Sequence, residues 1–77
     1  MPKSCQIVAA RALLALEQRE LAQLAEVSVS TLIRFEAGGW GDIQGSAKTI
    51  NRVLAVLEHK GVIFSELGVE LTRKPRR

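Results

Sequence analysis

Few side chains in this sequence could take part in chemistry, and they form no catalytic set. The chain has one Cys and one His, and it contains no Cys–His, Ser–His or paired-carboxylate arrangement typical of an enzyme. His59 lacks a second ligand at metal-binding spacing, so we interpret it as a surface residue and expect neither a metal nor another cofactor. The glycine-rich stretch 37–45 lacks the Lys and Ser/Thr that end a phosphate-binding loop, and no strand precedes it. The sequence therefore does not predict an enzyme.

Recognition is the chemistry that remains, and its candidate residues lie in the stretch 29–36. At helical spacing, Leu32 and Phe35 share one face of this stretch. The opposite face carries Val29, Ser30, Ile33 and Arg34. It is small and polar with one cation, which suits hydrogen bonding to another surface. Ser28 is well placed to cap this helix, since its hydroxyl can accept from a backbone N–H of the first turn.

A second short helix must hold the first in place, and residues 18–25 have the pattern for it. Leu21, Leu24 and Ala25 fall at i, i+3 and i+4, which makes one face apolar. The side chains left for solvent are Arg19, Glu20 and Gln23. A break of three residues, 26–28, separates the two patterns. Residues 18–36 therefore predict two short helices that meet at a tight turn.

This stretch resembles a known family. The run from Gln18 to Gly38 reads Gln-x-Glu-Leu-Ala-x-x-Ala-x-Val-Ser-x-x-Thr-Leu-x-x-Phe-Glu-x-Gly, which is similar to the helix-turn-helix signature of Cro/repressor-like (XRE) DNA-binding proteins. The similarity extends loosely from about Ile7 to Gly61. It implies a mainly α fold, a compact four-helix domain, followed in this chain by a short C-terminal β-hairpin or strand pair.

The turn departs from the family pattern. The family usually has Gly where this chain has Glu26. Either Glu26 adopts the left-handed region at a cost of roughly 1 kcal/mol, or the turn is slightly reshaped.

The resemblance also implies which residues contact DNA. The second helix of such a motif enters the major groove, where Arg34 can bond guanine through two N–H groups, Ser30 can donate or accept, and Val29 can press on a thymine methyl. In the family, the residue at Gln18 contacts the DNA backbone or braces a base-reading side chain. Ile33 flanks these positions with a less certain role. The predicted DNA contacts are Arg11, Gln18, Arg19, Ser28, Val29, Ser30, Thr31 and Arg34. Each of these residues, taken alone, also has a structural interpretation: Gln18 and Ser28 can be helix caps, and Arg34 can be a solvated charge.

Arg11 has a second implied role. In the family, an arginine at this position commonly pairs with the glutamate that ends the recognition helix, which is Glu36 in this chain. Such a pair would tie the first helix to the end of the third, and the alternative is a solvated surface arginine.

Two further helices are predicted to frame the motif. The first covers residues 5–16, with Ser4 as a candidate cap. Its buried stripe is Ile7, Ala10 and Leu14. The last begins at about residue 46 and ends near residue 60, because Gly61 follows. Its stripe is Ile50, Val53, Leu54 and Leu57, and its early turns carry Lys48 and Arg52.

Two segments outside the helices each allow two interpretations. Trp40, in the glycine-rich loop, either lies against the DNA backbone or a second subunit, or folds back over the core. Residues 62–64 and 69–72 predict two short strands whose apolar face needs a cover, either the helices or the same element of a partner. The resemblance favours the partner, so we predict dimerisation through Val62, Phe64, Val69 and Leu71.

Composition limits the class of protein. Eleven Lys and Arg and eight Asp and Glu give a net charge of +3, but the basic tail 73–77 holds four of the cations, so the rest is nearly balanced. No apolar run approaches the roughly 20 residues of a membrane span. With a single Cys and no signal-like segment, we expect a soluble cytoplasmic protein without a membrane partner.

The domain plan and the function follow from these patterns. We assign residues 1–61 to the helix-turn-helix domain, with motif 18–36 and recognition helix 29–36, residues 62–72 to a dimerisation element, and 73–77 to a tail that is disordered when free. The expected function is a sequence-specific transcriptional regulator, a repressor or activator that binds double-stranded DNA at an inverted repeat as a homodimer. The alternative is an antitoxin or adaptor that binds a protein partner through the C-terminal strands.

Overall fold

The computed structural model of the chain describes residues 1–72. Its elements are α1 (Ser4–Leu13), α2 (Gln18–Ala25), α3 (Val29–Glu36), α4 (Ala47–His59), β1 (Val62–Phe64) and β2 (Val69–Leu71). The predicted mainly α class, with four helices and a C-terminal strand pair, is confirmed for these residues. The predicted basic tail, residues 73–77, lies outside the described residues.

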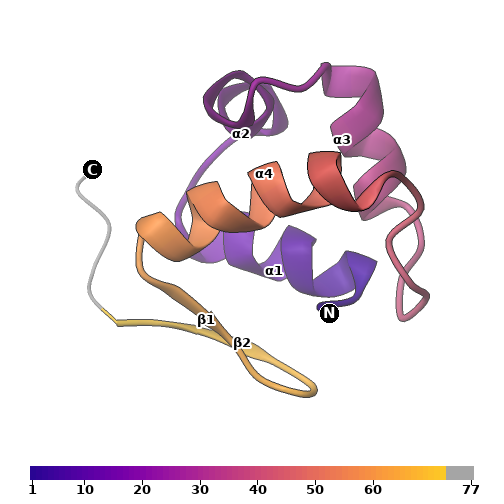
Figure 1. Cartoon of the computed structure of the whole chain (residues 1–77). Coiled ribbons are helices and arrows are strands. Elements are labelled where there is room, and N and C mark those ends of the chain that lie inside the picture. The colour runs from indigo at the N-terminus through magenta and orange to yellow at the C-terminus, as the bar shows by residue number, and fades with distance from the viewer. Residues whose placement is uncertain (73–77) are drawn as a thin grey trace.

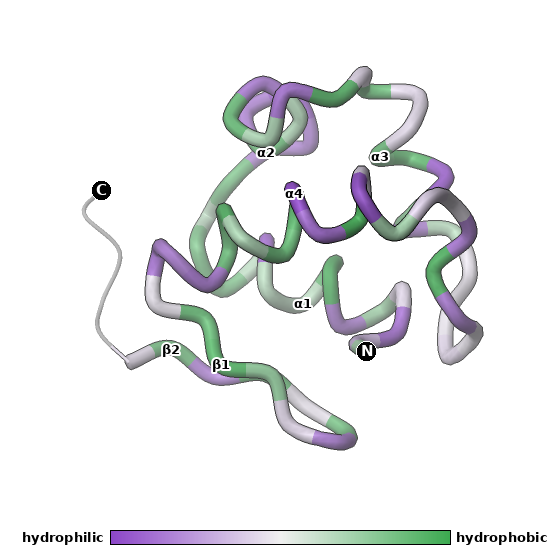
Figure 2. Tube along the Cα trace, in the orientation of Figure 1, coloured by the Kyte–Doolittle hydropathy of each residue, from purple (hydrophilic) through white to green (hydrophobic). Residues whose placement is uncertain are grey.

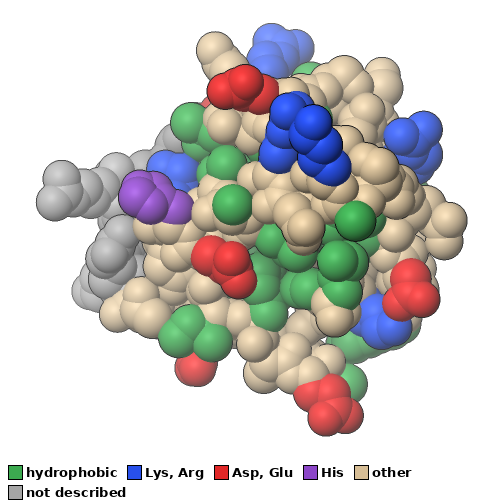
Figure 3. All heavy atoms as spheres, in the orientation of Figure 1, with side chains coloured by type: hydrophobic (Ala, Val, Ile, Leu, Met, Phe, Trp, Pro, Cys, Tyr) green, Lys and Arg blue, Asp and Glu red, His purple; other side chains and the backbone are tan. Residues whose placement is uncertain are grey.

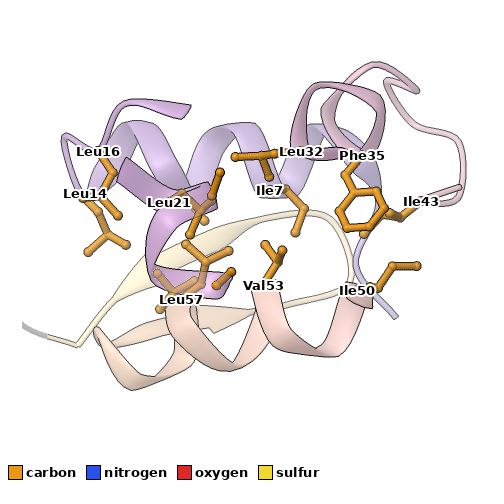
Figure 4. Close-up of a cluster of buried hydrophobic side chains, with 14 residues drawn as sticks. Ile7, Leu14, Leu16, Leu21, Leu32, Phe35, Ile43, Ile50, Val53 and Leu57 are labelled. Atoms are coloured by element: carbon orange, nitrogen blue, oxygen red, sulfur yellow. The ribbon is translucent and has the colours of Figure 1, made fainter. Parts of the chain in front are cut away.

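The helices enclose one core, with the hairpin on the far side from α2 and α3 (Figure 1). Side chains from all four helices meet in it, with Leu16 and Ile43 from the connecting segments (Figure 4). The largest fully buried side chains are Phe35, Ile7, Leu21, Leu32, Leu57 and Val53. The hairpin contacts α1 through β2 and α4 through β1. Thus α1 and α4 form the middle of the molecule, and α2 and α3 are left with one free side.

The prediction for α1 is right in its buried stripe and wrong at both ends. Ile7, Ala10 and Leu14 are buried as expected. Ser4 is not the cap: the N-cap is Lys3, and the Ser4 side chain is buried with its Oγ unbonded within the described residues. The helix ends at Leu13 instead of residue 16, because Ala15 takes a left-handed backbone with φ 55°. That turn brings Leu16 into the core.

The predicted apolar stripe of α2 is one residue off. Leu21 and Ala25 are buried as predicted, but the third member is Ala22, and Leu24 is 49% exposed. The inward positions therefore follow i, i+1 and i+4, which turns Leu24 to the edge of the helix. An alanine fits where α2 packs closely against its neighbours.

The last helix follows its predicted pattern. Ser46 is the N-cap, and its Oγ accepts from the backbone N–H of Thr49 at 3.2 Å. The stripe points inward, with Ile50, Val53 and Leu57 buried and Leu54 half-buried. Gly61 ends the helix with φ 99°, a conformation that glycine adopts at low cost.

The hairpin forms as predicted, but its inner face is covered by the chain's own helices. The strands are antiparallel and pair Val62 with Leu71 and Phe64 with Val69. Val62 is 3% exposed, and the other three of these side chains are half-buried against the core. The chain's own helices thus cover Val62 fully and the other three side chains in part, and dimerisation through these four residues stays a prediction. Gln6 attaches the hairpin turn to α1, since its Nε2 donates to the carbonyls of Ser65 at 2.8 Å and Gly68 at 2.9 Å.

The glycine-rich loop is fastened to the start of α1. The backbone N–H groups of Ser4 and Cys5 donate to the carbonyls of Gly41 and Gly39, at 3.2 and 2.8 Å. The side chains of Lys3 and Asp42 form an exposed ion pair at 2.6 Å. The Lys3 hydrogen bond, followed by the Lys3 charge, lowers the pKa of Asp42 below its usual value. The loop thereby supplies acceptors to the first amides of the helix.

Trp40 at the tip of this loop does not cover the core. Its side chain is 61% exposed, while Ile43 from the same loop is 8% exposed and joins the core. Of the two alternatives for Trp40, the inward one is therefore excluded. Further along, a Cβ on Gly45 would stand 2.5 Å from a ring carbon of Phe35, so the loop needs glycine there.

Candidate nucleic-acid interface

The turn between α2 and α3 is closed by backbone bonds and by one strained residue. The N–H groups of Glu26 and Val27 donate to the carbonyls of Gln23 and Ala22 at 3.2 and 3.0 Å, which is the Schellman pattern of a helix end. Glu26 has φ 58° and ψ 43°. The first of the two alternatives for this position is thus the observed one, with a non-glycine residue in the left-handed region.

Ser28 starts α3 in the predicted way. Its Oγ accepts from the Thr31 backbone N–H at 3.0 Å and donates to the Thr31 Oγ1 at 2.8 Å. Ser28 and Thr31 are therefore engaged with each other at the helix N-terminus. Both remain at the surface, since Ser28 is exposed and Thr31 half-buried.

The outward face of α3 is open to solvent. Ser30 and Arg34 are exposed, and beside them lie the apolar side chains of Val29 and Ile33, which are 37% and 49% exposed. Leu32 and Phe35 anchor the opposite face in the core. One short helix thus offers a guanidinium, a hydroxyl and two branched apolar groups along one side.

Glu36 holds this helix at its C-terminal end. The carboxylate is 5% exposed and accepts from Arg11 Nε at 2.9 Å and from Arg11 Nη2 at 3.1 Å. Gln18 Nε2 donates to the same carboxylate at 2.8 Å. The remaining Arg11 nitrogen, Nη1, donates to the Leu16 carbonyl at 3.0 Å. One buried acceptor therefore joins α1, the start of α2 and the end of α3.

These bonds decide two of the sequence-based predictions. The predicted pair of Arg11 and Glu36 is present, and all three Arg11 nitrogens have acceptors inside the molecule, so the prediction that Arg11 contacts phosphate is not favoured by the geometry. Gln18 braces Glu36 and is not the cap, because Glu17 precedes the helix. Sequence reasoning missed the contact of Gln18 with Glu36, because the motif marks Gln18 without indicating its partner.

Beside α3 lies a shallow hollow of about 380 Å³ between the starts of α2 and α3. It is lined by Glu17, Gln18, Arg19, Glu20 and Val29. Two carboxylates and one guanidinium make its charge negative, so it is poorly suited to an anion. Arg19, exposed at its rim, is the only lining residue that can attract a phosphate.

The exposed cations of the described helices lie on the motif and on the first half of α4. Arg19 and Arg34 come from the motif, and Lys48 and Arg52 from the first half of α4 are exposed as well. In Figure 3, the hairpin end at the bottom shows acidic side chains, and most of the blue lies above it. The molecule therefore has a modest polarity of charge that the near balance of its composition conceals.

No protein-family model matches this chain, and no curated protein matches it significantly in sequence. Among the described residues there is no helix with the length and apolar character of a membrane span, and no group of His, Cys, Asp or Glu that could hold a metal ion.

Proposed function

We propose that the chain is a Cro/repressor-like helix-turn-helix regulator that reads DNA sequence with α3. The supporting observation is the outward face of α3, which is exposed along its whole length while Leu32 and Phe35 hold the helix to the core. Arg34, Ser30 and Val29 are the base-reading residues, and Ile33 adds a second apolar contact. The cytoplasm is the proposed compartment.

The dimensions of α3 suit this role. An α-helix with its side chains is about 10 to 12 Å in diameter, which fits a B-DNA major groove about 12 Å wide, and the eight residues of α3 give about two turns to lie in it. Arg19 and Ser28 lie at the start of the motif, where they can add phosphate contacts that set the orientation of α3. Arg11, Gln18 and Glu36 are positioning residues, since they fix α3 to α1 and α2 from inside.

A single α3 reads only a few base pairs, so the proposal includes a two-fold dimer on an inverted repeat. The half-sites are expected about one helical turn, roughly 34 Å, apart. No effector-binding domain is needed, because occupancy can follow the protein's own concentration.

The test is to select bound fragments from random DNA at stated salt, and then to measure Arg34→Ala on the selected site and on a scrambled one. We expect a loss of about 1 to 3 kcal/mol on the selected site, with relaxed preference at one position per half-site. Arg52→Ala, which removes the same charge from exposed α4, should leave the ratio of the two affinities unchanged. An equal loss on both DNAs for Arg34→Ala, or no selected sequence at all, contradicts the proposal.

A protein-binding role is the second candidate, and two exposed side chains favour it. Ile63 on β1 is 47% exposed and Leu67 at the hairpin tip is 73% exposed. An antitoxin or adaptor would use such a hairpin to bind another chain. A partner that co-purifies with the full chain, and is lost when residues 62–77 are removed, supports this role.

A further inference from the structure

The solvent-facing side of α1 is entirely apolar. Its residues are Cys5, Val8, Ala9, Ala12 and Leu13. Val8 and Leu13 are 36% and 42% exposed, both alanines are exposed, and Cys5 is half-buried. At 3.6 residues per turn these five positions form one continuous stripe from the start of the helix to its end.

The other helices do not share this feature. The outward sides of α2, α3 and α4 carry exposed residues such as Arg19, Arg34 and Arg52. The polar residues within α1 are turned elsewhere: Gln6 bonds the hairpin and Arg11 bonds Glu36. In Figure 2, α1 is correspondingly pale to green over most of its length. A surface helix normally presents polar residues to water, so an apolar outward side is typical of an interface.

The apolar surface continues onto the hairpin. Gln6 stands next to Ala9 and Leu13 on the helix, at i+3 and i+7, and its side chain bonds both ends of the hairpin turn. The strand that lies along α1 is β2. Its two apolar residues, Val69 and Leu71, are only half-buried by the chain itself. The stripe and the β2 edge thus form one surface, which we call the α1 face.

We propose that the α1 face binds the α1 face of a second copy of this chain across a two-fold axis. The α1 face, composed of the stripe on α1 with Val69 and Leu71, contains no charged group, so it has no attraction for DNA or for a strongly charged protein. A neutral apolar surface is complementary to itself, as a two-fold interface requires. Ala9 near the middle of the helix and Ala12 near its end let two helix axes approach closely.

The area explains why the hairpin must take part. The ten residues of α1 span about 15 Å, and one side of a single helix this short falls well below the roughly 800 Å² per subunit of a standard interface. The half-buried Val69 and Leu71 enlarge the surface, while the exposed Glu70 between them points to the opposite face of the hairpin. We therefore expect a dimer of moderate affinity that dissociates on dilution. This dimer is the one that the proposed DNA binding invokes, but it rests on α1 and not on α3.

The test is analytical ultracentrifugation of the full chain without DNA, over a wide range of concentration. Wild type should be a concentration-dependent dimer, and Ala12→Glu should raise the dimer dissociation constant about tenfold or more, because it buries a carboxylate at the centre of the interface. The matched control is Ala55→Glu, the same change at an exposed alanine of α4, which should leave dimerisation unchanged. Circular dichroism establishes that each variant is folded.

A second measurement uses wild type alone, so it tests the proposal even if Ala12→Glu does not fold. In wild type, alkylation of Cys5 should slow as the concentration rises through the dimer transition, since Cys5 lies at the edge of the α1 face. A wild-type monomer at every concentration overturns the proposal. So does a dimer that Ile63→Glu dissociates and Ala12→Glu does not, because that result places the interface on the outer side of the hairpin. If dimerisation behaves as expected and no DNA sequence is selected, the proposed function fails and the α1 face stands.

Discussion

At the scale of single residues, Glu36 does the most to place α3. Its carboxylate is 5% exposed and takes all of its observed bonds from Arg11 and Gln18, which lie on other helices. A buried carboxylate with charged and neutral donors is stabilised only while those donors remain. The exposed residues of α3 therefore depend on a group that itself touches nothing outside the molecule.

Removing either partner of this pair should destabilise the fold. Glu36→Ala leaves the Arg11 guanidinium largely buried without its carboxylate, and we expect a loss on the order of 3 kcal/mol in the free energy of unfolding. The double variant Arg11→Met, Glu36→Leu should lose less than the sum of the single variants. Urea denaturation followed by the fluorescence of the single tryptophan measures both.

The control for this prediction is the other ion pair. Asp42→Ala removes the carboxylate of the exposed Lys3 pair, and its effect should be much smaller, because exposed pairs are screened by water. If Asp42→Ala lowered the free energy of unfolding as much as Glu36→Ala, burial could not be the reason for the larger effect at Glu36.

The same residues show what a sequence can predict at this scale. The pairing of Arg11 with Glu36 was predictable from the family pattern, because both positions are marked in it. The bond from Gln18 to Glu36 was not, since it depends on how the start of α2 approaches the end of α3. The sequence favours Ser4 as the cap because Ser is a favourable N-cap residue, but the helix begins one residue earlier, with Lys3 as the N-cap and the loop carbonyls of Gly41 and Gly39 accepting from Ser4 and Cys5.

At the scale of elements, the turn at residues 26–28 determines how α2 and α3 are arranged. The break at residues 26–28 and the cap Ser28 make two helices predictable, and α2, α3 and α4 match their predicted bounds within a residue or so. The predictions fail for residues at the edges of these elements. Leu24 is exposed because Ala22 fits the closer contact, and the hairpin's cover could not be predicted because an apolar strand face looks the same whether its own helices or a partner cover it.

The turn supplies a test of backbone strain. Glu26→Gly should raise the free energy of unfolding by up to about 1 kcal/mol, because glycine adopts φ 58° without a clash at Cβ. Part of this gain is offset by the greater freedom of glycine in the unfolded chain. Glu26→Ala is the matched control, since it removes the carboxylate and keeps the strain. If both variants stabilise the protein equally, the carboxylate and not the backbone was the cause.

At the scale of the whole molecule, the two proposed surfaces belong to different helices. The proposed DNA binding uses α3, and the proposed dimerisation uses α1 with β2, while Glu36 and Arg11 connect α3 to α1. Because α1 and α3 are packed and bonded together, a dimer through α1 would fix the separation of the two α3 helices. A rigid dimer discriminates between spacings of the half-sites, whereas two independent monomers do not.

This arrangement predicts a spacing effect that only the dimer can produce. Wild type should bind two inverted half-sites about one helical turn apart more tightly than the same half-sites moved by a further half turn, which carries one of them to the opposite side of the DNA. Ala12→Glu should lose this preference and still prefer a single selected half-site over scrambled DNA, because α3 is intact. Fluorescence anisotropy of labelled duplexes measures both ratios. A spacing preference that survives Ala12→Glu, with the variant monomeric in solution, would mean that DNA itself brings the two subunits together.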